Sequence, residues 1–161
     1  MPHQSAAYQC VISNQLILTP VRSINGVGDR KLATEPVRMG ISEALILLAL
    51  LTLKHMFADY FLQTASMLAN RGQYVHPGRI MHCAVHAGCS AICFLIMGLP
   101  LGLSLAVLLA EFVAHFHIDW GKGRWSEMQG HTPSDAGYWR AFGADQALHH
   151  LTYVLMVAAF V

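Results

Sequence analysis

The chain has 161 residues, of which 55% are hydrophobic and 12% are charged, and its mean hydropathy is +0.44. A soluble domain carries about 25% charged residues, so this composition predicts an integral membrane protein. The formal net charge is +1 and no basic stripe is present, which excludes the class of proteins that bind nucleic acid through a basic surface.

Residues 1–40 differ in composition from the rest of the chain. They contain three prolines, several polar residues and four of the ten Lys and Arg residues. We therefore expect a poorly ordered N-terminal extension here, followed by a four-helix transmembrane domain at 41–161. The segment beginning at Met39 reads like a natural N-terminus, with Ser42 as a helix cap.

Four apolar segments follow, separated by turn-prone sequence. They predict helices over about 42–63, 80–97, 101–120, and from about 138–145 to 161. Glycine and proline mark loops at 64–80 and 121–134, and a tight turn at 98–100. Because short connections join antiparallel neighbours, the predicted fold is an all-α, integral membrane, antiparallel four-helix bundle.

Each predicted helix carries one pair of residues of the types that bind metals, spaced four apart. An i,i+4 spacing places two side chains on one helical face. Imidazole and carboxylate groups at adjacent turns are suitable ligands for a divalent cation. The pairs are His55 and Asp59, His82 and His86, His115 and Asp119, and Asp145 and His149.

The positions of these pairs along their helices point to one shared pocket. The pairs lie late in the first and third helices, and early in the second and fourth. In an up-down-up-down bundle these four positions fall at the same membrane face. We therefore predict that the pairs converge there and bind zinc or another divalent metal, as one ion or two.

Two other interpretations remain open. One His/Asp pair in a membrane helix commonly forms interhelical hydrogen bonds, and a row of such groups can also relay protons or ions. The cysteines at 83, 89 and 93 lack the spacing of a zinc ribbon and are expected to pack in an apolar helix. Neither a disulfide framework nor an oligomeric state follows from the sequence.

A metal at this position favours a hydrolase acting on an ester or phosphoester of a lipid or lipid-linked substrate. Two further residues are candidates for catalysis. Glu111 is either a general base and deeper ligand or a partner of Lys54. Lys122 either stabilises a phosphate or oxyanion, or anchors a helix end at the lipid surface.

The order of the motifs resembles an uncharacterised family of small bacterial and phage multi-pass membrane proteins, a domain of unknown function. The resemblance covers about 41–160 and implies a helical membrane protein with no established activity. A looser similarity links the pattern to inner-membrane proteins described as metal-dependent hydrolases. The motifs are His55-x-x-x-Asp59-Tyr-x-Leu62-Gln63, His82-x-x-x-His86, His115-x-x-x-Asp119-x-x-Lys122 and Asp145-Gln146-x-x-His149-x-x-Thr152.

The distribution of cations predicts a multi-pass orientation in a bacterial inner membrane. Lys and Arg residues flank the loops at 64–80 and 121–137, whereas the turn at 98–100 and the C-terminus carry none. Since cytoplasmic loops are enriched in these residues, we expect the two site-bearing loops to be cytoplasmic. The four cations of residues 1–38 favour the opposite orientation, unless translation starts at Met39.

Overall fold

The computed structural model describes residues 39–69 and 71–161, so most of the predicted N-terminal extension lies outside the described residues. The described chain is helical and contains no strand. Its elements are α1 (Ile41–Phe57), the π-helix η1 (Ala58–Leu62), α2 (Ala65–Leu68), α3 (Pro77–Ile96), α4 (Leu101–Gln129) and α5 (Ala136–Ala158).

Three helical segments of the described chain are long and apolar enough to cross a membrane. They are Ile41–Leu62, Pro77–Ile96 and Leu101–Gln129, with 22, 20 and 29 residues. About 20 residues of α-helix span the hydrocarbon core of a bilayer. The predicted membrane character is therefore supported. α5, with 23 residues, is not among the three.

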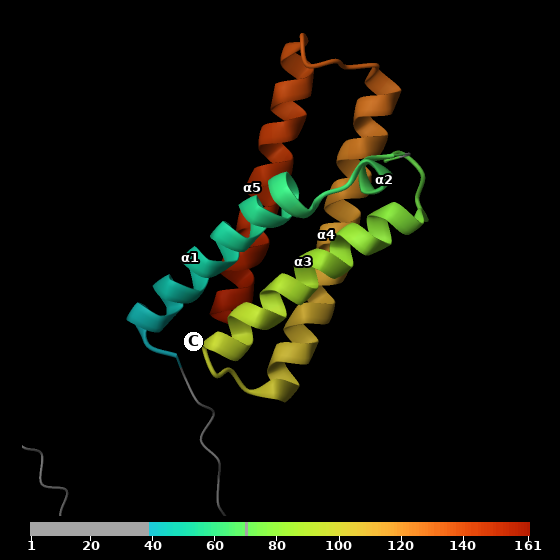
Figure 1. Cartoon of the computed structure of the whole chain (residues 1–161). Coiled ribbons are helices and arrows are strands. Elements are labelled where there is room, and N and C mark those ends of the chain that lie inside the picture. The colour runs from blue at the N-terminus through green and yellow to red at the C-terminus, as the bar shows by residue number, and fades with distance from the viewer. Residues whose placement is uncertain (1–38, 70) are drawn as a thin grey trace, which may run out of the picture. The chain divides into compact units, whose positions relative to one another are not determined.

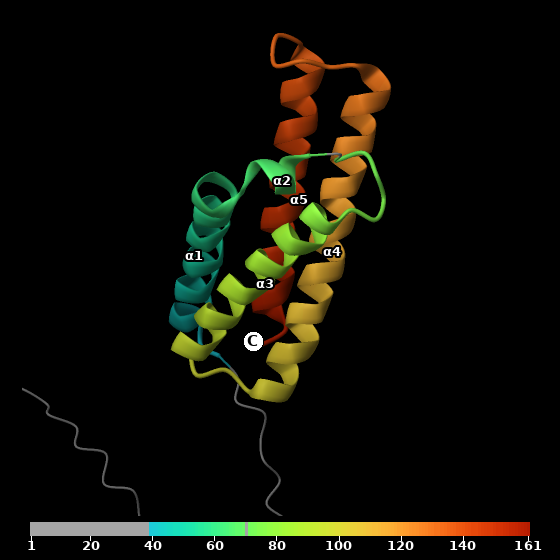
Figure 2. The same ribbon diagram turned by 45° about the vertical axis from the view of Figure 1, so that its right-hand side comes forward.

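The four long helices contact one another in a ring: α1 packs on α3 and α5, and α4 packs on the same two helices. In Figure 1, α1 and α3 slope across the pair formed by α4 and α5, and Figure 2 shows α3 crossing in front of that pair. Apolar side chains fill the interior near the α3–α4 turn, among them Leu51, Phe94 and Met156. The turn itself requires Gly98, whose φ is +64°.

The C-terminal half of α4 corrects one prediction. The sequence predicted a helix ending near residue 120 and a loop at 121–134, but α4 continues to Gln129. Gly123 was interpreted as a loop residue. Instead it lies inside the helix, where an added Cβ would come within 2.5 Å of the Arg71 carbonyl oxygen. This glycine therefore allows a close approach between backbones, and Lys122 lies within a helix instead of at its end.

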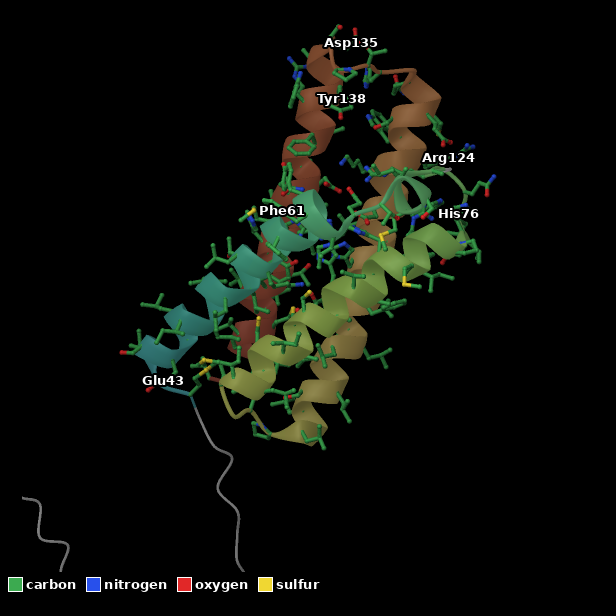
Figure 3. All side chains as sticks on the ribbon, viewed as in Figure 1. Glu43, Phe61, His76, Arg124, Asp135 and Tyr138 are labelled. Carbon is green, nitrogen blue, oxygen red and sulfur yellow. The ribbon has the colours of Figure 1, made fainter. Side chains whose placement is uncertain are left out.

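The α4–α5 connection is consequently short. Gly130 ends α4 with a left-handed φ of +63°. The main-chain N–H of Thr132 and its hydroxyl both donate to Asp135 Oδ2, at 2.7 and 2.8 Å. These two bonds lower the pKa of the Asp135 carboxyl. In Figure 3, Asp135 lies at the tip of this hairpin, at the opposite end of the helices from Glu43.

Two smaller elements were not predicted. The first helix was expected to run to about residue 63 as one α-helix, but its last turn, η1, is π-helical. A short helix, α2, begins after Thr64, whose hydroxyl accepts from the Met67 main-chain N–H. α3 also begins earlier than predicted, at Pro77, because a proline suits the first turn of a helix.

Candidate metal centre

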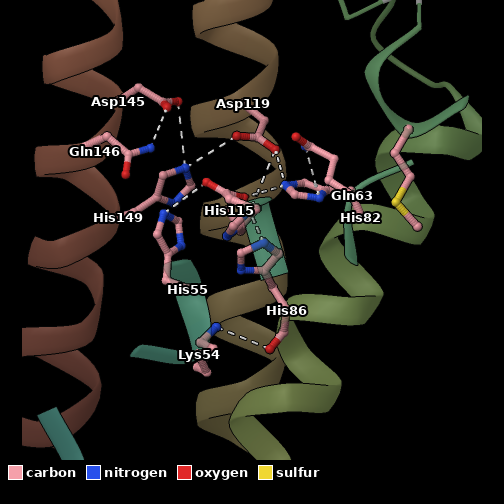
Figure 4. Close-up of polar contacts among 12 residues, drawn as sticks. Lys54, His55, Gln63, His82, His86, His115, Asp119, Asp145, Gln146 and His149 are labelled. Atoms are coloured by element: carbon pink, nitrogen blue, oxygen red, sulfur yellow. Dashed lines mark hydrogen bonds and ion pairs between the residues drawn. The ribbon is translucent and has the colours of Figure 1, made fainter. Parts of the chain in front are cut away.

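The structure brings together all four predicted pairs. They reach one place from α1 with η1, from α3, from α4 and from α5. Figure 4 shows the labelled imidazoles and carboxylates pointing toward one another between these helices. The ring centroids of His86 and His149 lie 4.0 and 4.1 Å from that of His115. The convergence that the spacing predicted is thus present, while the function of these groups as ligands stays a prediction.

Asp59 forms one centre of the cluster. Its carboxylate oxygens lie 3.3 Å from His55 Nε2, 3.1 Å from His86 Nε2 and 3.5 Å from His82 Nε2. α3 supplies two of these imidazoles, and α1 supplies the third. The i,i+4 contact of Asp59 with His55 is therefore extended by two contacts from a neighbouring helix.

Asp119 forms the second centre. Its oxygens lie 3.3 Å from His82 Nε2, 3.5 Å from His115 Nε2 and 3.3 Å from His149 Nε2. His149 also approaches Asp145, with 3.7 Å between Nε2 and Oδ1. Since His82 contacts both Asp59 and Asp119, the two centres are directly adjacent.

These separations match those between two ligands of one metal ion. Two zinc ligands bound at about 2.0–2.1 Å in tetrahedral geometry lie about 3.3 Å apart. The contacts of His86 with Asp59 and of His149 with Asp119 also satisfy hydrogen-bond geometry, at 3.1 and 3.3 Å, although most N–H···O hydrogen bonds are shorter, at about 2.9–3.0 Å. Moreover, His55 Nε2, His115 Nε2 and Asp145 Oδ1 are buried without a hydrogen-bond partner. Buried polar atoms need a partner, and a cation bound within the cluster would supply one to each of these atoms.

Several groups of three residues could each hold one ion. Among the described residues, ligand atoms lie within 4.8 Å of one another in five groups of three. Two of these groups that share no member are His55 with Asp59 and His86, and Asp119 with Asp145 and His149. Since they share no ligand, the cluster has enough donors for two metals. Another group joins the buried Cys83 to His115 and Asp119, although the position of this cysteine in an apolar helix predicted only packing.

Two side chains orient the imidazoles from outside the cluster. The Tyr153 hydroxyl lies 2.8 Å from His55 Nδ1, and Gln63 Nε2 lies 3.3 Å from His82 Nδ1. A hydrogen bond from His55 Nδ1–H to the Tyr153 oxygen selects the tautomer that leaves Nε2 of His55 free to bind a metal, whereas the Gln63 amide donates to His82 Nδ1 and orients that ring. Tyr153 was not a predicted site residue, although it lies four residues beyond His149 on the same helical face.

Glu111 lies away from the metal-binding groups, and it pairs with Lys54. Lys54 Nζ is 2.5 Å from Glu111 Oε1, and the Ser90 hydroxyl donates to the same oxygen at 2.9 Å. Lys54 also donates to the His86 carbonyl oxygen, at 3.2 Å. Of the two roles that the sequence left open for Glu111, the contact with Lys54 is therefore the one present.

The cluster opens on one side into a small polar cavity of about 100 Å³. The side chains of Asp59 and Asp119 are 20% and 23% exposed, whereas each of the five histidines is at most 4% exposed. The carboxylates therefore face the opening, and the imidazoles close the other side. The cavity is lined by Asp59, Tyr60, Gln63, Arg71, His82, Asp119, Lys122, Phe142, Asp145 and Gln146.

Positively charged side chains lie at the opening of this cavity. Lys122 Nζ lies 3.2 Å from Asp145 Oδ2, to which Gln146 also donates at 3.2 Å. Arg71 is held nearby because Arg79 donates to the main-chain carbonyls of Arg71, Gln73 and Tyr74. Neither arginine was a predicted site residue. Both belong to the turn-prone segment at 64–80, and its sequence does not indicate that this segment packs over the cavity.

Comparison with known proteins gives a family but no characterised relative. No curated protein and no solved structure matches this chain. The family described as Protein of unknown function (DUF3307) matches residues 46–161, a range that includes all four pairs. Since this match covers more than half of the sequence, the chain belongs to the DUF3307 family.

Proposed function

We propose that this protein is a membrane-embedded, metal-dependent hydrolase of a phosphoester, with its site at one membrane face. In this proposal α5 is a fourth membrane span, and the four long helices form an antiparallel transmembrane bundle in a bacterial inner membrane. The observation that carries the proposal is the placement of five Nε2 atoms 3.1–3.5 Å from the oxygens of two carboxylates.

The chemistry of the donor set suits zinc or a similar divalent ion. Neutral imidazoles bind such ions through Nε2, and carboxylates lower the cost of removing the ion from water. When bound, the metal would supply a nucleophilic hydroxide at neutral pH and polarise the phosphoryl group. Two divalent ions would carry one more charge than Asp59, Asp119 and Asp145 neutralise, so the site would attract an anionic substrate.

The remaining residues have distinct proposed roles. Lys122 and Arg71 would bind the non-reacting phosphoryl oxygens at the cavity, where both residues contribute to the lining. One of the exposed carboxylate oxygens of Asp59 or Asp119 would accept the proton of the attacking water. Glu111 would act as a positioning residue, because it is buried beneath the cluster and bound to Lys54.

The apolar interior of the bundle favours a hydrolase and disfavours a protein that conducts ions across the membrane. A path would need polar groups from one membrane face to the other. The region between the cluster and the α3–α4 turn is instead packed with side chains such as Leu47, Phe94 and Val157. Among the described residues, the Lys54–Glu111 pair is the deepest charged pair on this side of the cluster, and the buried polar side chain farther along α4 is the neutral Ser104.

The test combines metal content with hydrolysis. Full-length protein is purified in detergent without chelators, and its bound metals are measured by elemental analysis. We expect one or two equivalents of zinc or a similar divalent ion, together with phosphoester hydrolysis that a chelator abolishes and added metal restores. Metal-free protein that fails to bind zinc on titration would defeat the proposal and leave the cluster as interhelical polar packing.

A further inference from the structure

A second, larger cavity adjoins the metal centre. It is a groove of about 490 Å³ between α4 and α5. Ile118, Gly121 and Trp125 of α4 face Ala141, Ala144 and Leu148 of α5 across it. Binding sites for small molecules commonly occupy about 300–1,000 Å³, so the groove has the size of a site, whereas the polar cavity of about 100 Å³ suits a small polar group.

The groove is apolar and open along its length. Two large hydrophobic side chains on its margin, Trp125 and Leu148, are 53% and 49% exposed. At Gly121 no heavy atom lies within 4 Å of the place that a Cβ would take. The small residues at 121, 141 and 144 therefore leave a channel between two helices, in place of the packed contact that larger side chains would make.

Lys122 and Asp145 connect the groove to the metal centre, because both residues line the groove and the polar cavity. The Lys122 ammonium is 3.2 Å from Asp145 Oδ2 and 4.9 Å from the centroid of the Phe142 ring. An occupant of both spaces would thus have an anionic group beside Lys122 and the cluster, and an apolar chain in the groove. That is the chemistry of an amphiphile with one charged end.

We propose that the groove binds the hydrocarbon chain of a membrane lipid whose phosphate head group occupies the polar cavity. A lipid phosphoester is then the substrate class of the hydrolase, and this part of the inference rests on the proposed function. Ile118 and Leu148 line the end of the groove that is nearest the apolar halves of α4 and α5. A chain can therefore enter sideways from the bilayer, and Trp125 lies farther along, as an aromatic residue of the interface does.

Binding is tested without any need for hydrolysis. Full-length protein in detergent micelles is irradiated with a lipid phosphate that carries a diazirine in its acyl chain, and the labelled peptides are identified by mass spectrometry. We expect labelling to concentrate in 117–125 and 141–148, and excess unlabelled lipid phosphate to compete where glycerol phosphate does not. Labelling spread evenly over the exposed faces of α1, α3, α4 and α5 would overturn the proposal.

A matched pair of variants tests the groove itself. In Gly121→Leu the new side chain enters the groove. In Gly143→Leu the same change is made on α5 at a position outside the groove, also with no heavy atom within 4 Å. Gly121→Leu should reduce groove labelling by about tenfold, the equivalent of losing roughly two buried methylene contacts. Gly143→Leu should label as the unmodified chain does, and equal labelling in both variants would contradict the groove.

Hydrolysis assays separate this inference from the proposed function. Lipid phosphates with chains of increasing length are compared with glycerol phosphate. We expect kcat/KM to rise with chain length, and Gly121→Leu to reduce the ratio of long-chain to short-chain kcat/KM by about tenfold. If kcat/KM were equal for all acyl-chain lengths, the assignment of a lipid substrate would be wrong, but the proposed hydrolase activity would remain supported. Groove labelling without hydrolysis of any phosphoester would defeat the hydrolase and leave lipid binding standing.

Discussion

Asp119 Oδ1 lies 3.3 Å from His149 Nε2, although the two residues belong to different helices and Asp119 already contacts two other histidines. This carboxylate thus joins α4 to α3 and α5. A group in this position either binds a cation together with the imidazoles or accepts hydrogen bonds from them. The two possibilities predict different effects of removing its charge.

We expect Asp119→Asn to lose bound metal while the protein remains folded. Asparagine keeps the shape of the side chain, but it lacks the negative charge that offsets the dehydration of a divalent ion. Elemental analysis should show metal in the purified wild type and a reduction of at least about tenfold in the variant. The helices should remain folded in detergent, since an interhelical polar contact in a membrane contributes only about 0.6 kcal/mol.

Asp135→Asn is the matched control for that experiment. Asp135 lies in the α4–α5 connection, where its carboxylate accepts from Thr132, outside the cluster. This variant should retain the metal content of the wild type. If Asp119→Asn also retained it, the cluster would not be the site of binding.

We expect Lys54→Met to destabilise the protein more than the double variant Lys54→Met/Glu111→Gln. The single change leaves a buried carboxylate, 1% exposed, without its cation, and breaking a buried pair in this way costs about 3–5 kcal/mol. Neutralising both partners removes that penalty. Unfolding free energies of the two variants in mixed micelles provide the measurement, and equal losses in both would show that the pair contributes nothing as a pair.

The sequence was most informative where chemistry follows helical spacing. Four i,i+4 pairs identified the residues that now surround Asp59 and Asp119, because the helical repeat alone places each pair on one face. The sequence was misleading at Gly121 and Gly123, because a glycine predicts a turn when its tertiary contacts are not known. The close approach of the Arg71 backbone, which accounts for Gly123, depends on a contact between residues about fifty positions apart. No local pattern contains such information.

For Tyr153→Phe we expect weaker metal binding with an intact fold. The hydroxyl lies 2.8 Å from His55 Nδ1 and orients that ring, and loss of such a partner typically reduces metal affinity about 10–100-fold. Phenylalanine preserves the packing of the ring in the core. Competition with a chelator of known zinc affinity measures the change. Undiminished zinc affinity would mean that His55 is held by its helix alone.

The two connections that border the cluster should face the cytoplasm. The described Lys and Arg residues other than Lys54 lie near this end of the helices: Arg71, Arg79, Lys122, Arg124 and Arg140. We expect a cysteine introduced at Ser134 to resist a membrane-impermeant thiol reagent in intact cells and to react after lysis. The unmodified chain, with its own four cysteines, gives the background. Labelling of the Ser134→Cys variant in intact cells would reverse the orientation.

The π-helical turn at Ala58–Leu62 has a consequence for how insertions and deletions are read in this family. Three α-helical steps and four π-helical steps turn a chain through nearly the same angle, about 300° and roughly 320°. A chain with one residue fewer between Asp59 and Gln63 could therefore replace the wide turn with an ordinary one and still direct both side chains to the same neighbours. A one-residue gap at this point in an alignment is thus compatible with an unchanged cluster, whereas a similar gap between His115 and Asp119 would turn one of them away.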